Sequence, residues 1–283
     1  MRGENVYIKG VLEEVESVEK VFKEMIYVLN TSGKLTEQDV TTIINLTAEG
    51  KEVVAEKEIE NIVLYTKKDV IKAKTGTQIE YFNSVQKNDI CFAIGPAGTG
   101  KTYLAVALAV ASLKKGVVQR IVLARPAVEA GESLGFLPGD FKEKIDPYLR
   151  PLYDALQDML PADQLANYML KGIVEIVPLA YMRGRTLNNA YVILDEAQNA
   201  TTTQMKMFLT RLGPNSKAII TGDITQIDLP VRSNSGLVQV QSILNTVEGV
   251  GFVYFKKSDV VRHRLVKDII EAYEKFNNGE EKS

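Results

Sequence analysis

Two stretches of the sequence carry residue types suited to phosphate chemistry, and the first is rich in glycine. It fills every fixed position of the P-loop pattern GxxxxGK[ST] and reads Gly95-Pro96-Ala97-Gly98-Thr99-Gly100-Lys101-Thr102. Glycines let backbone N–H groups turn inward around a phosphate, and the N-terminus of a following helix adds partial positive charge. We expect Lys101 to reach the β- and γ-phosphates of a nucleotide and the Thr102 hydroxyl to coordinate Mg²⁺.

The second stretch is an apolar run that ends in two carboxylates. Ile193 and Leu194 are followed directly by Asp195 and Glu196. After a buried strand, Asp195 is expected to hold Mg²⁺ and Glu196 to polarise an attacking water molecule. P-loop kinases and GTPases generally lack a carboxylate in the place of Glu196, and no NKxD sequence occurs in the chain. ATP hydrolysis is therefore favoured over phosphate transfer to a small molecule.

A third polar group follows the apolar run 218–221. It consists of Gly222 and Asp223, with Gln226 three residues further on. A polar side chain at the end of a strand can sense the γ-phosphate, so Gln226 is the predicted sensor. A turn that caps a helix is the alternative interpretation of the same residues.

The elements that position these groups alternate along the chain. Strands are predicted over 90–94, 121–124, 173–177, 191–194, 218–221 and 252–255, and helices over 103–113, 140–159, 162–171, 202–212, 236–244 and 259–276. Such alternation predicts an α/β fold with a mostly parallel sheet covered by helices on both faces. Ligands bind at the carboxyl ends of parallel strands, and all three polar groups follow strands.

Two features of the region after the P-loop helix depart from this regular pattern. Pro147 and Pro151 are expected to break the helix over 140–159. The loop over 125–139 contains glycines and prolines and is long for a connection inside a compact domain. Loops of that length are usually functional.

The first 75 residues have a different pattern and are predicted to form a small α/β region, ahead of an ATPase domain over 76–283. Within this region we expect strands over 5–9, 62–65 and 70–73 and helices over 12–30 and 36–50. The region is not a basic arm, and it contains no GxxG sequence of the kind that clamps RNA in KH domains.

Composition sets the broad class of the protein. The chain has 283 residues, a formal net charge of −2 and 45% hydrophobic residues, so no overall basic field indicates a nucleic-acid partner. Its one cysteine, Cys91, lies in a predicted buried strand and cannot form an internal disulfide. No apolar run has the length of a membrane span, and the N-terminus does not resemble a signal peptide. We expect a cytoplasmic protein without a membrane partner.

Longer blocks carry a resemblance to a known family. The run 195–198 (Asp-Glu-Ala-Gln) and the run 221–226 (Thr-Gly-Asp-Ile-Thr-Gln) resemble motifs II and III of superfamily-one helicases. The whole stretch from 71 to about 273 resembles the PhoH family, with further specific blocks at 71–75, 125–132, 134–140, 147–153, 181–187 and 259–263.

This resemblance implies a single RecA-like domain that binds and hydrolyses ATP with Mg²⁺. It places Gln78 where the helicase Q-motif reads the edge of adenine, with Tyr81 as a possible stacking neighbour. The N-terminal region is similar to the second half of a KH-like unit. The only histidine, His263, is expected to help position the last helix.

The resemblance also implies an assembly. Superfamily-one helicases take an arginine for the γ-phosphate from a second lobe, and this chain has room for one lobe only. Either a neighbouring subunit donates this arginine or turnover is slow. The resemblance to ring ATPases implies a homo-oligomer such as a hexamer. The candidate arginines are Arg262, which we favour, Arg183 and Arg185.

The macromolecular partner implied by the resemblance is single-stranded RNA, together with a small metal-dependent endoribonuclease of ribosomal RNA maturation. Four arginines lie near the predicted carboxyl edge of the sheet, where they would either track a phosphate backbone or form internal ion pairs: Arg125, Arg150, Arg183 and Arg185. A helicase or translocase that depends on RNA and a nucleotide-gated adapter with incidental hydrolysis both remain open. Phosphate transfer to a small molecule is disfavoured because no lid for an acceptor is apparent.

Overall fold

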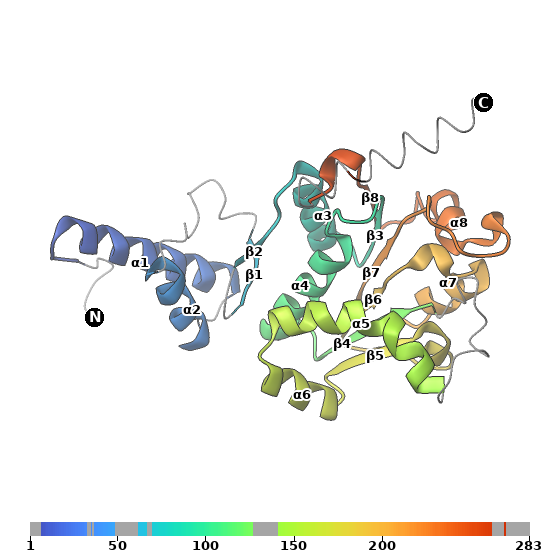
Figure 1. The fold of residues 1–283 in the computed structure, drawn as a ribbon, viewed down its shortest axis with the longest axis horizontal. Helices are drawn as coiled ribbons and strands as arrows, with labels where there is room; N and C mark the ends of the chain where they lie inside the picture. Colours follow the sequence, from blue (N-terminus) through green and yellow to red (C-terminus); the bar gives the residue numbers. More distant parts are fainter. Residues whose placement is uncertain are drawn as a thin grey trace.

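A computed structural model describes residues 7–32, 35, 37–48, 62–66, 70–126, 141–261 and 269 of the chain. Figure 1 shows a body built on a sheet, with the helices α1 and α2 extending from it at one end and α7 and α8 lying at the other. The carboxyl edge of that sheet positions the P-loop, Asp195, Glu196 and Gln226.

Six parallel strands form the central sheet in the order β5-β4-β6-β7-β3-β8. Their bounds are β3 Ile90–Ile94, β4 Arg120–Arg125, β5 Val174–Pro178, β6 Ala190–Leu194, β7 Lys217–Gly222 and β8 Val250–Tyr254. The P-loop strand β3 and the carboxylate strand β6 are separated by β7, which is the order of a RecA-like core. The predicted α/β fold with a parallel sheet is confirmed.

Successive residues of each strand face opposite sides of the sheet, and each side has its own apolar cluster. On β3, Cys91 and Ala93 belong to one cluster, while Phe92 and Ile94 belong to the other. Because both faces are covered, these strands are apolar at nearly every position. The covering helices are α3 Gly76–Lys87, α4 Lys101–Lys114, α5 Phe141–Met159 and α6 Ala162–Leu170 on the first side and α7 Thr202–Leu209 and α8 Gly236–Ile243 on the second.

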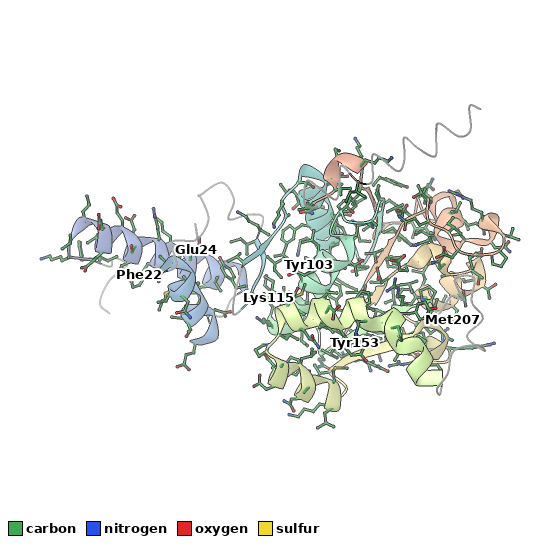
Figure 2. All side chains as sticks on the ribbon, viewed as in Figure 1. Phe22, Glu24, Tyr103, Lys115, Tyr153 and Met207 are labelled. Carbon is green, nitrogen blue, oxygen red and sulfur yellow. The ribbon has the colours of Figure 1, made fainter. Side chains whose placement is uncertain are left out.

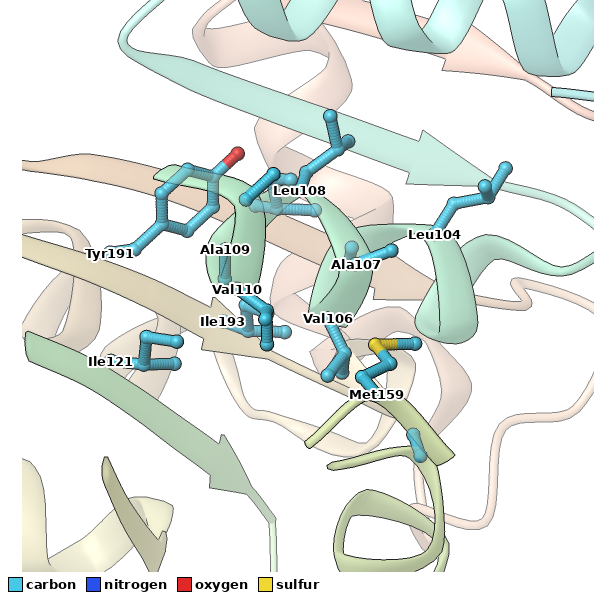
Figure 3. Packing of buried hydrophobic residues seen from close by; sticks show 14 of the residues in the cluster. Leu104, Val106, Ala107, Leu108, Ala109, Val110, Ile121, Met159, Tyr191 and Ile193 are labelled. Atoms are coloured by element: carbon cyan, nitrogen blue, oxygen red, sulfur yellow. The ribbon is translucent and has the colours of Figure 1, made fainter. Parts of the chain in front are cut away.

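Helix α4 is buried on nearly all sides. Every residue from Leu104 to Ala111 is buried. Figure 3 shows α4 packed against Tyr191 and Ile193 of β6 and against Met159 of α5. A helix that is apolar all round needs such enclosure. Its N-terminal end is therefore fixed at the carboxyl edge of the sheet.

The N-terminal part consists of α1 Leu12–Ser32, α2 Glu37–Ala48 and an antiparallel ribbon of β1 Ile62–Tyr65 and β2 Val70–Lys72. The ribbon packs on α4, and its residues Val63, Leu64 and Ile71 belong to the same apolar cluster as that helix. A boundary between domains at residue 75 stays a prediction.

A side-chain hydrogen bond ties α1 to the ribbon. The Tyr65 hydroxyl donates to Glu24 Oε2 at 2.5 Å. Glu24 and Phe22 are labelled on α1 in Figure 2; Glu24 is buried and Phe22 is exposed. Burial raises the pKa of the Glu24 carboxyl, and the Tyr65 hydrogen bond opposes this rise. The polar contact offsets part of the cost of burying the carboxyl.

Three expectations about helices are wrong. Pro147 and Pro151 lie inside a continuous α5, because the buried stripe that the helix presents to the core outweighs the hydrogen bonds the prolines lose. Helix α7 ends at Leu209 instead of Leu212, since the Arg211 carbonyl accepts from the Leu187 N–H at 2.8 Å. Helix α3 was not expected at all.

The two ends of the chain also differ from expectation. Residues 7–9 of the strand predicted over 5–9 are not in a strand, and the other two lie outside the described residues. The closing helix does not begin at Asp259, because a 3₁₀ helix, Lys257–Asp259, leads into an extended Val260. Most of that predicted helix, with Arg262 and His263, lies outside the described residues, as does most of the loop over 125–139.

Two features are absent from the part of the chain that the structure describes. There, no helix is long and apolar enough to cross a membrane. Nor does that part of the chain bring together three or more His, Cys, Asp or Glu side chains in a metal-binding cluster.

Candidate nucleotide and magnesium site

The P-loop has a backbone that only glycine fits well at several positions. Gly98 and Gly100 have φ angles of 82° and 81°, in the left-handed region. Gly95 has a φ of 149°, and a Cβ added there would lie 2.4 Å from the carbonyl oxygen of Phe255. The glycines therefore allow both the turn of the loop and its close approach to the segment after β8.

Backbone hydrogen bonds hold the loop from both sides. The Gly95 N–H donates to the Gly222 carbonyl at 3.0 Å, and the Phe255 N–H donates to the carbonyl of Ile94 at 2.7 Å. Further along, the Val261 N–H donates to the Gly98 carbonyl at 2.9 Å. The end of β7 and the segment after β8 thus fix the loop before any ligand arrives.

The Lys101 ammonium lies inside the loop. It donates to the carbonyl oxygens of Gly95 and Pro96, each at 2.6 Å, and approaches Thr99 Oγ1 at 3.3 Å. Only 7% of Lys101 is exposed. A buried ammonium attracts an anion strongly because the surrounding dielectric is low. The loop therefore fits a phosphate group, with a cation already in place.

Asp195 joins three elements through one oxygen atom. Its Oδ1 accepts from Thr102 Oγ1 of α4 at 2.6 Å and from Thr221 Oγ1 of β7 at 2.7 Å. Asp195 itself follows β6 and is buried. The hydroxyl and the carboxylate are hard oxygen donors of the kind that Mg²⁺ prefers, and Mg²⁺ commonly takes only one or two protein ligands beside phosphates and water. These residues fit a Mg²⁺ ion.

Glu196 follows with a strained backbone. Its φ of 51° and ψ of 39° are left-handed, which costs a residue with a side chain about 1 kcal/mol. The carboxylate is held at both oxygens: Oε1 lies 3.2 Å from Arg125 Nη2, and Oε2 accepts from Gln198 Nε2 at 2.5 Å. This geometry fixes where the carboxylate points.

The surroundings of Glu196 also change its acidity. Burial is the main cause that raises the pKa of its carboxyl, and the negative charge of Asp195 adds to the rise. Arg125, the Gln198 hydrogen bond and Lys101 oppose it. A carboxylate with a raised pKa accepts a proton more readily, which suits a general base.

Gln198 belongs to the site, although sequence reasoning gave it no role. It is 1% exposed, and its Oε1 accepts from the Asp223 N–H at 3.0 Å while its Nε2 reaches Glu196. A Cβ added at Gly222 would lie 2.7 Å from that Oε1, so glycine there leaves room for the side chain. Gln198 connects the carboxyl ends of β6 and β7. The sequence feature that could have indicated a role for Gln198 is its position as the last residue of the block 195–198, which resembles a helicase motif.

The predicted sensor Gln226 lies on the same edge. Its Nε2 donates to Asp223 Oδ2 at 2.9 Å, and Asp223 Oδ1 accepts from the N–H and the hydroxyl of Thr225 at 2.9 and 2.6 Å. Gln226 is exposed, while Asp223 is buried. The sensing role stays a prediction, and this network places the Gln226 amide at the rim of the site.

One cavity of about 260 Å³ brings these residues together. Its size is close to the lower end for ligand pockets and suits the phosphate end of a nucleotide. Tyr103, labelled at the start of α4 in Figure 2, also lines it. The other lining residues are Ala97, Gly98, Gly100, Lys101, Thr102, Asp195, Glu196, Gly222, Asp223 and Gln226.

Gln78 lies behind the P-loop on α3. Its Nε2 donates to the Thr99 carbonyl at 2.9 Å, and its Oε1 accepts from the Lys74 N–H at 2.6 Å. Gln78 is buried and supports the loop; its contact with adenine stays a prediction. Tyr81 cannot stack on a base as expected, because it is fully buried and packs edge-on against Phe255, with ring centroids 5.6 Å apart.

The candidate arginines have different surroundings. Arg125 pairs with Glu196, and Arg185 forms a bidentate pair with Glu175 of β5 at 2.6 and 2.9 Å. For these two the alternative of an internal ion pair is confirmed. Arg150 and Arg183 are exposed. Arg262 lies outside the described residues.

Comparison with known proteins identifies relatives of this chain. The family model described as PhoH-like protein matches residues 70–274, which include every residue of the cavity. The chain is 52% identical to a PhoH-like protein of Bacillus subtilis over 277 residues, covering 98% of this chain and 87% of that protein. It is 47% identical to a PhoH-like protein of Synechocystis over 279 residues, covering 98% and 85%.

Among solved structures, the SWI2/SNF2 ATPase core of Sulfolobus solfataricus, determined in complex with double-stranded DNA, is a loose match. Its TM-score is 0.40 at 13% identity, covering 68% of this chain and 47% of that one. The two sequence relatives match almost the whole chain, and the family model spans the complete P-loop, Asp195 and Glu196. The chain belongs to the PhoH-like protein family.

Proposed function

We propose that this protein binds ATP with Mg²⁺ and hydrolyses it. The observation that carries the proposal is the position of Glu196, which lines the same cavity as Lys101 and follows directly after Asp195. A phosphate-binding loop alone would also serve a kinase or a GTPase. A carboxylate beside the metal ligand supplies a base for water.

Each residue has a role in this proposal. Lys101 exchanges its loop carbonyls for the β- and γ-phosphate oxygens, and Thr102 and Asp195 hold Mg²⁺. The ion, when bound, neutralises charge on the phosphates. Glu196 orients the attacking water and takes up its proton, and Gln226 senses the γ-phosphate.

The test is release of inorganic phosphate from ATP by the purified protein with Mg²⁺. We expect Glu196→Gln to bind ATP and to lose at least about a hundredfold in kcat, because an amide cannot accept the proton. Lys101→Ala should lose ATP binding itself. Equal loss of binding in both variants would contradict the role of Glu196. Phosphate found on another molecule, and none released, would indicate a transferase.

A more specific proposal concerns the nucleic acid and the subunits with which the protein acts. We propose that the protein acts on single-stranded RNA in the cytoplasm, as a homo-oligomer in which Arg262 of one subunit reaches the γ-phosphate of the next. Support comes from the resemblance of the runs 195–198 and 221–226 to helicase motifs. The same proposal includes a hexamer as the assembly and an endoribonuclease of ribosomal RNA maturation as a protein partner. An RNA oligonucleotide that raises the ATPase rate would support an RNA motor. A slow rate indifferent to RNA would favour a nucleotide-gated adapter.

Mixing variants tests the arginine. Subunits with Arg262→Ala keep an intact P-loop, and subunits with Lys101→Ala keep Arg262. If the arginine acts between chains, a mixture of the two is expected to regain ATPase activity that neither has alone. No recovery in assemblies shown to be mixed would contradict this role.

A further inference from the structure

We propose that Arg125 restrains Glu196 and ties it to helix α5, so that release of this restraint sets the rate of ATP turnover. The inference rests on the proposed ATPase function and adds a mode of regulation to it. Its starting point is the pairing of β4 with β6, in which Ala124 lies opposite Leu194 and the Ala124 carbonyl accepts from the Asp195 N–H at 2.9 Å. Arg125, the last residue of β4, therefore lies beside the residues that follow β6.

One guanidinium serves two elements. Arg125 Nη2 lies 3.2 Å from Glu196 Oε1, while Nη1 donates to the main-chain carbonyl of Tyr148 in α5 at 2.6 Å. The Arg125 side chain is 18% exposed and the Glu196 side chain 38%. The planar guanidinium holds its donors in a fixed fork, so a shift of one partner is felt by the other.

The contacts of Glu196 make this a restraint. Arg125 occupies Oε1 and Gln198 occupies Oε2, so each oxygen already receives a hydrogen-bond donor or an ion-pair partner. These two contacts fix the direction in which the carboxylate points, while each oxygen keeps a second lone pair that water can use. Arg125 does not line the cavity, although Glu196 does. The Arg125 guanidinium therefore lies outside the nucleotide cavity and holds the Glu196 carboxylate toward itself.

Helix α5 is the element to which the restraint is anchored. Its residues Leu149, Leu152 and Leu156 are buried, and the helix contacts α4, β4 and β5. On the same helix, Pro147 and Arg150 are exposed. A force applied to this outer side would move the Tyr148 carbonyl and, through Arg125, the carboxylate of Glu196. Figure 1 shows α5 running across the body, next to α4.

The experiment measures kcat and KM for ATP in the full chain. Arg125→Met keeps the apolar stem of the side chain and removes its charge and donors. We expect kcat to rise about twofold to fivefold, the range that an ion pair of this exposure can account for. KM should stay within about twofold, because the P-loop is untouched. Arg125→Lys keeps a charge but not the fork, so a smaller rise is expected.

Two further variants show whether the effect passes through Glu196. The double variant Arg125→Met with Glu196→Gln should be as inactive as Glu196→Gln alone. Glu175→Gln is the matched control: it breaks another half-buried pair, between Glu175 and Arg185, and should leave kcat unchanged. A rise in Glu175→Gln equal to that in Arg125→Met would overturn the proposal.

Hydrogen exchange tests the link to α5. Amides in the turn of Tyr148 should exchange faster in Arg125→Met, and those of α6 should not change. An unchanged or lowered kcat in Arg125→Met, in a protein whose circular dichroism matches the parent, overturns the restraint. If Arg125→Met does not fold, Arg125→Lys decides in the same way. A parent protein without any ATPase activity would instead refute the proposed function, so the two failures are distinguishable.

Discussion

The Thr102 hydroxyl donates to Asp195 Oδ1 at 2.6 Å and so joins the first turn of α4 to the end of β6. The two residues are 93 positions apart in the sequence. Their contact places a hydroxyl and a carboxylate side by side at the mouth of the P-loop, and Thr221 donates to the same oxygen from β7. This meeting of three elements defines the candidate magnesium site.

Thr102→Ala is expected to raise the Mg²⁺ concentration needed for half-maximal ATPase activity by about ten- to a hundredfold, as loss of a supporting group does at other metal sites. Thr102→Ser keeps the hydroxyl and should resemble the parent. Thr221→Val removes the other donor to Asp195 and keeps the shape, so a smaller shift is expected. A Mg²⁺ titration of phosphate release measures all three. An unchanged Mg²⁺ requirement in Thr102→Ala would contradict the role of that hydroxyl as a ligand of the metal.

Gly222→Ala is expected to disturb the site through Gln198. The added Cβ would lie 2.5 Å from Leu237 Cδ2 and 2.7 Å from Gln198 Oε1, so neighbours must shift. We expect a loss of about 1–3 kcal/mol in the free energy of unfolding and a lower kcat, because Gln198 no longer holds Glu196. Urea unfolding and phosphate release measure the two effects.

Gly76→Ala is the control for this substitution. No atom lies within 4 Å of a Cβ added at Gly76, which is the first residue of α3. Alanine favours helix over glycine, so stability should be unchanged or slightly higher. Equal behaviour of the two variants would mean that the close approach at Gly222 has no consequence for the site.

The sheet and most of the site were predictable for one physical reason. Parallel strands buried on both faces are apolar runs, and polar residues directly after such runs collect at one edge. This reasoning placed the P-loop, Asp195, Glu196 and Gln226 together, and the cavity contains residues of all four.

Helix α3 shows what the same reasoning missed. Thr75 caps it by accepting from the Gln78 N–H at 3.2 Å, and a threonine followed three residues later by glutamine is a helix-start pattern. Gln78, Tyr81 and Val85 are then spaced along one helical face, and all three are buried. This helical spacing would have predicted that Tyr81 lies in the core and does not stack on the adenine base.

Side-chain partners across the sheet could not be predicted in this way. Arg125 meets Glu196 because β4 and β6 are neighbours with a particular register, whereas Arg185 reaches Glu175 of β5 from the connection between β5 and β6. Strand order and register follow from how the whole sheet packs, and no local pattern in the sequence specifies them.

Cys91 is expected to resist alkylation in the native protein. It is 1% exposed, and burial raises the pKa of its thiol to about 11, against the opposing effects of Ser84 and Lys217. At pH 8 only about one thiol in a thousand is then ionised, and the thiolate is the reactive form. Iodoacetamide labelling should be slow in the folded protein and rapid in urea.

The raised pKa of the Cys91 thiol also predicts that the free energy of unfolding depends on pH. Because the folded pKa lies above the unfolded value of about 8.5, the folded state favours the protonated thiol. This contribution is fully present below pH 8.5 and is lost as the pH rises toward 11. Cys91→Ala should remove both this loss of unfolding free energy at high pH and the labelling by iodoacetamide. Rapid labelling of the native parent would show that the strand before the P-loop opens readily.

Tyr191→Phe is expected to leave the free energy of unfolding unchanged or to raise it by up to about 1 kcal/mol. Tyr191 is 1% exposed and lies on the face of β6 that packs against α4 (Figure 3), and its hydroxyl has no hydrogen-bond partner among the described residues. A buried hydroxyl without a partner costs free energy, and phenylalanine keeps the ring that fills the space.

Tyr65→Phe provides the contrast to this variant, since the Tyr65 hydroxyl donates to the buried Glu24. Its removal leaves a carboxyl without that donor, so a loss of about 1–3 kcal/mol is expected. Urea unfolding of both variants compares a hydroxyl that lacks a partner with one that has one. A loss in Tyr191→Phe as large as that in Tyr65→Phe would show that the Tyr191 hydroxyl is hydrogen-bonded in solution, and a water molecule enclosed between the sheet and α4 would then be part of the fold.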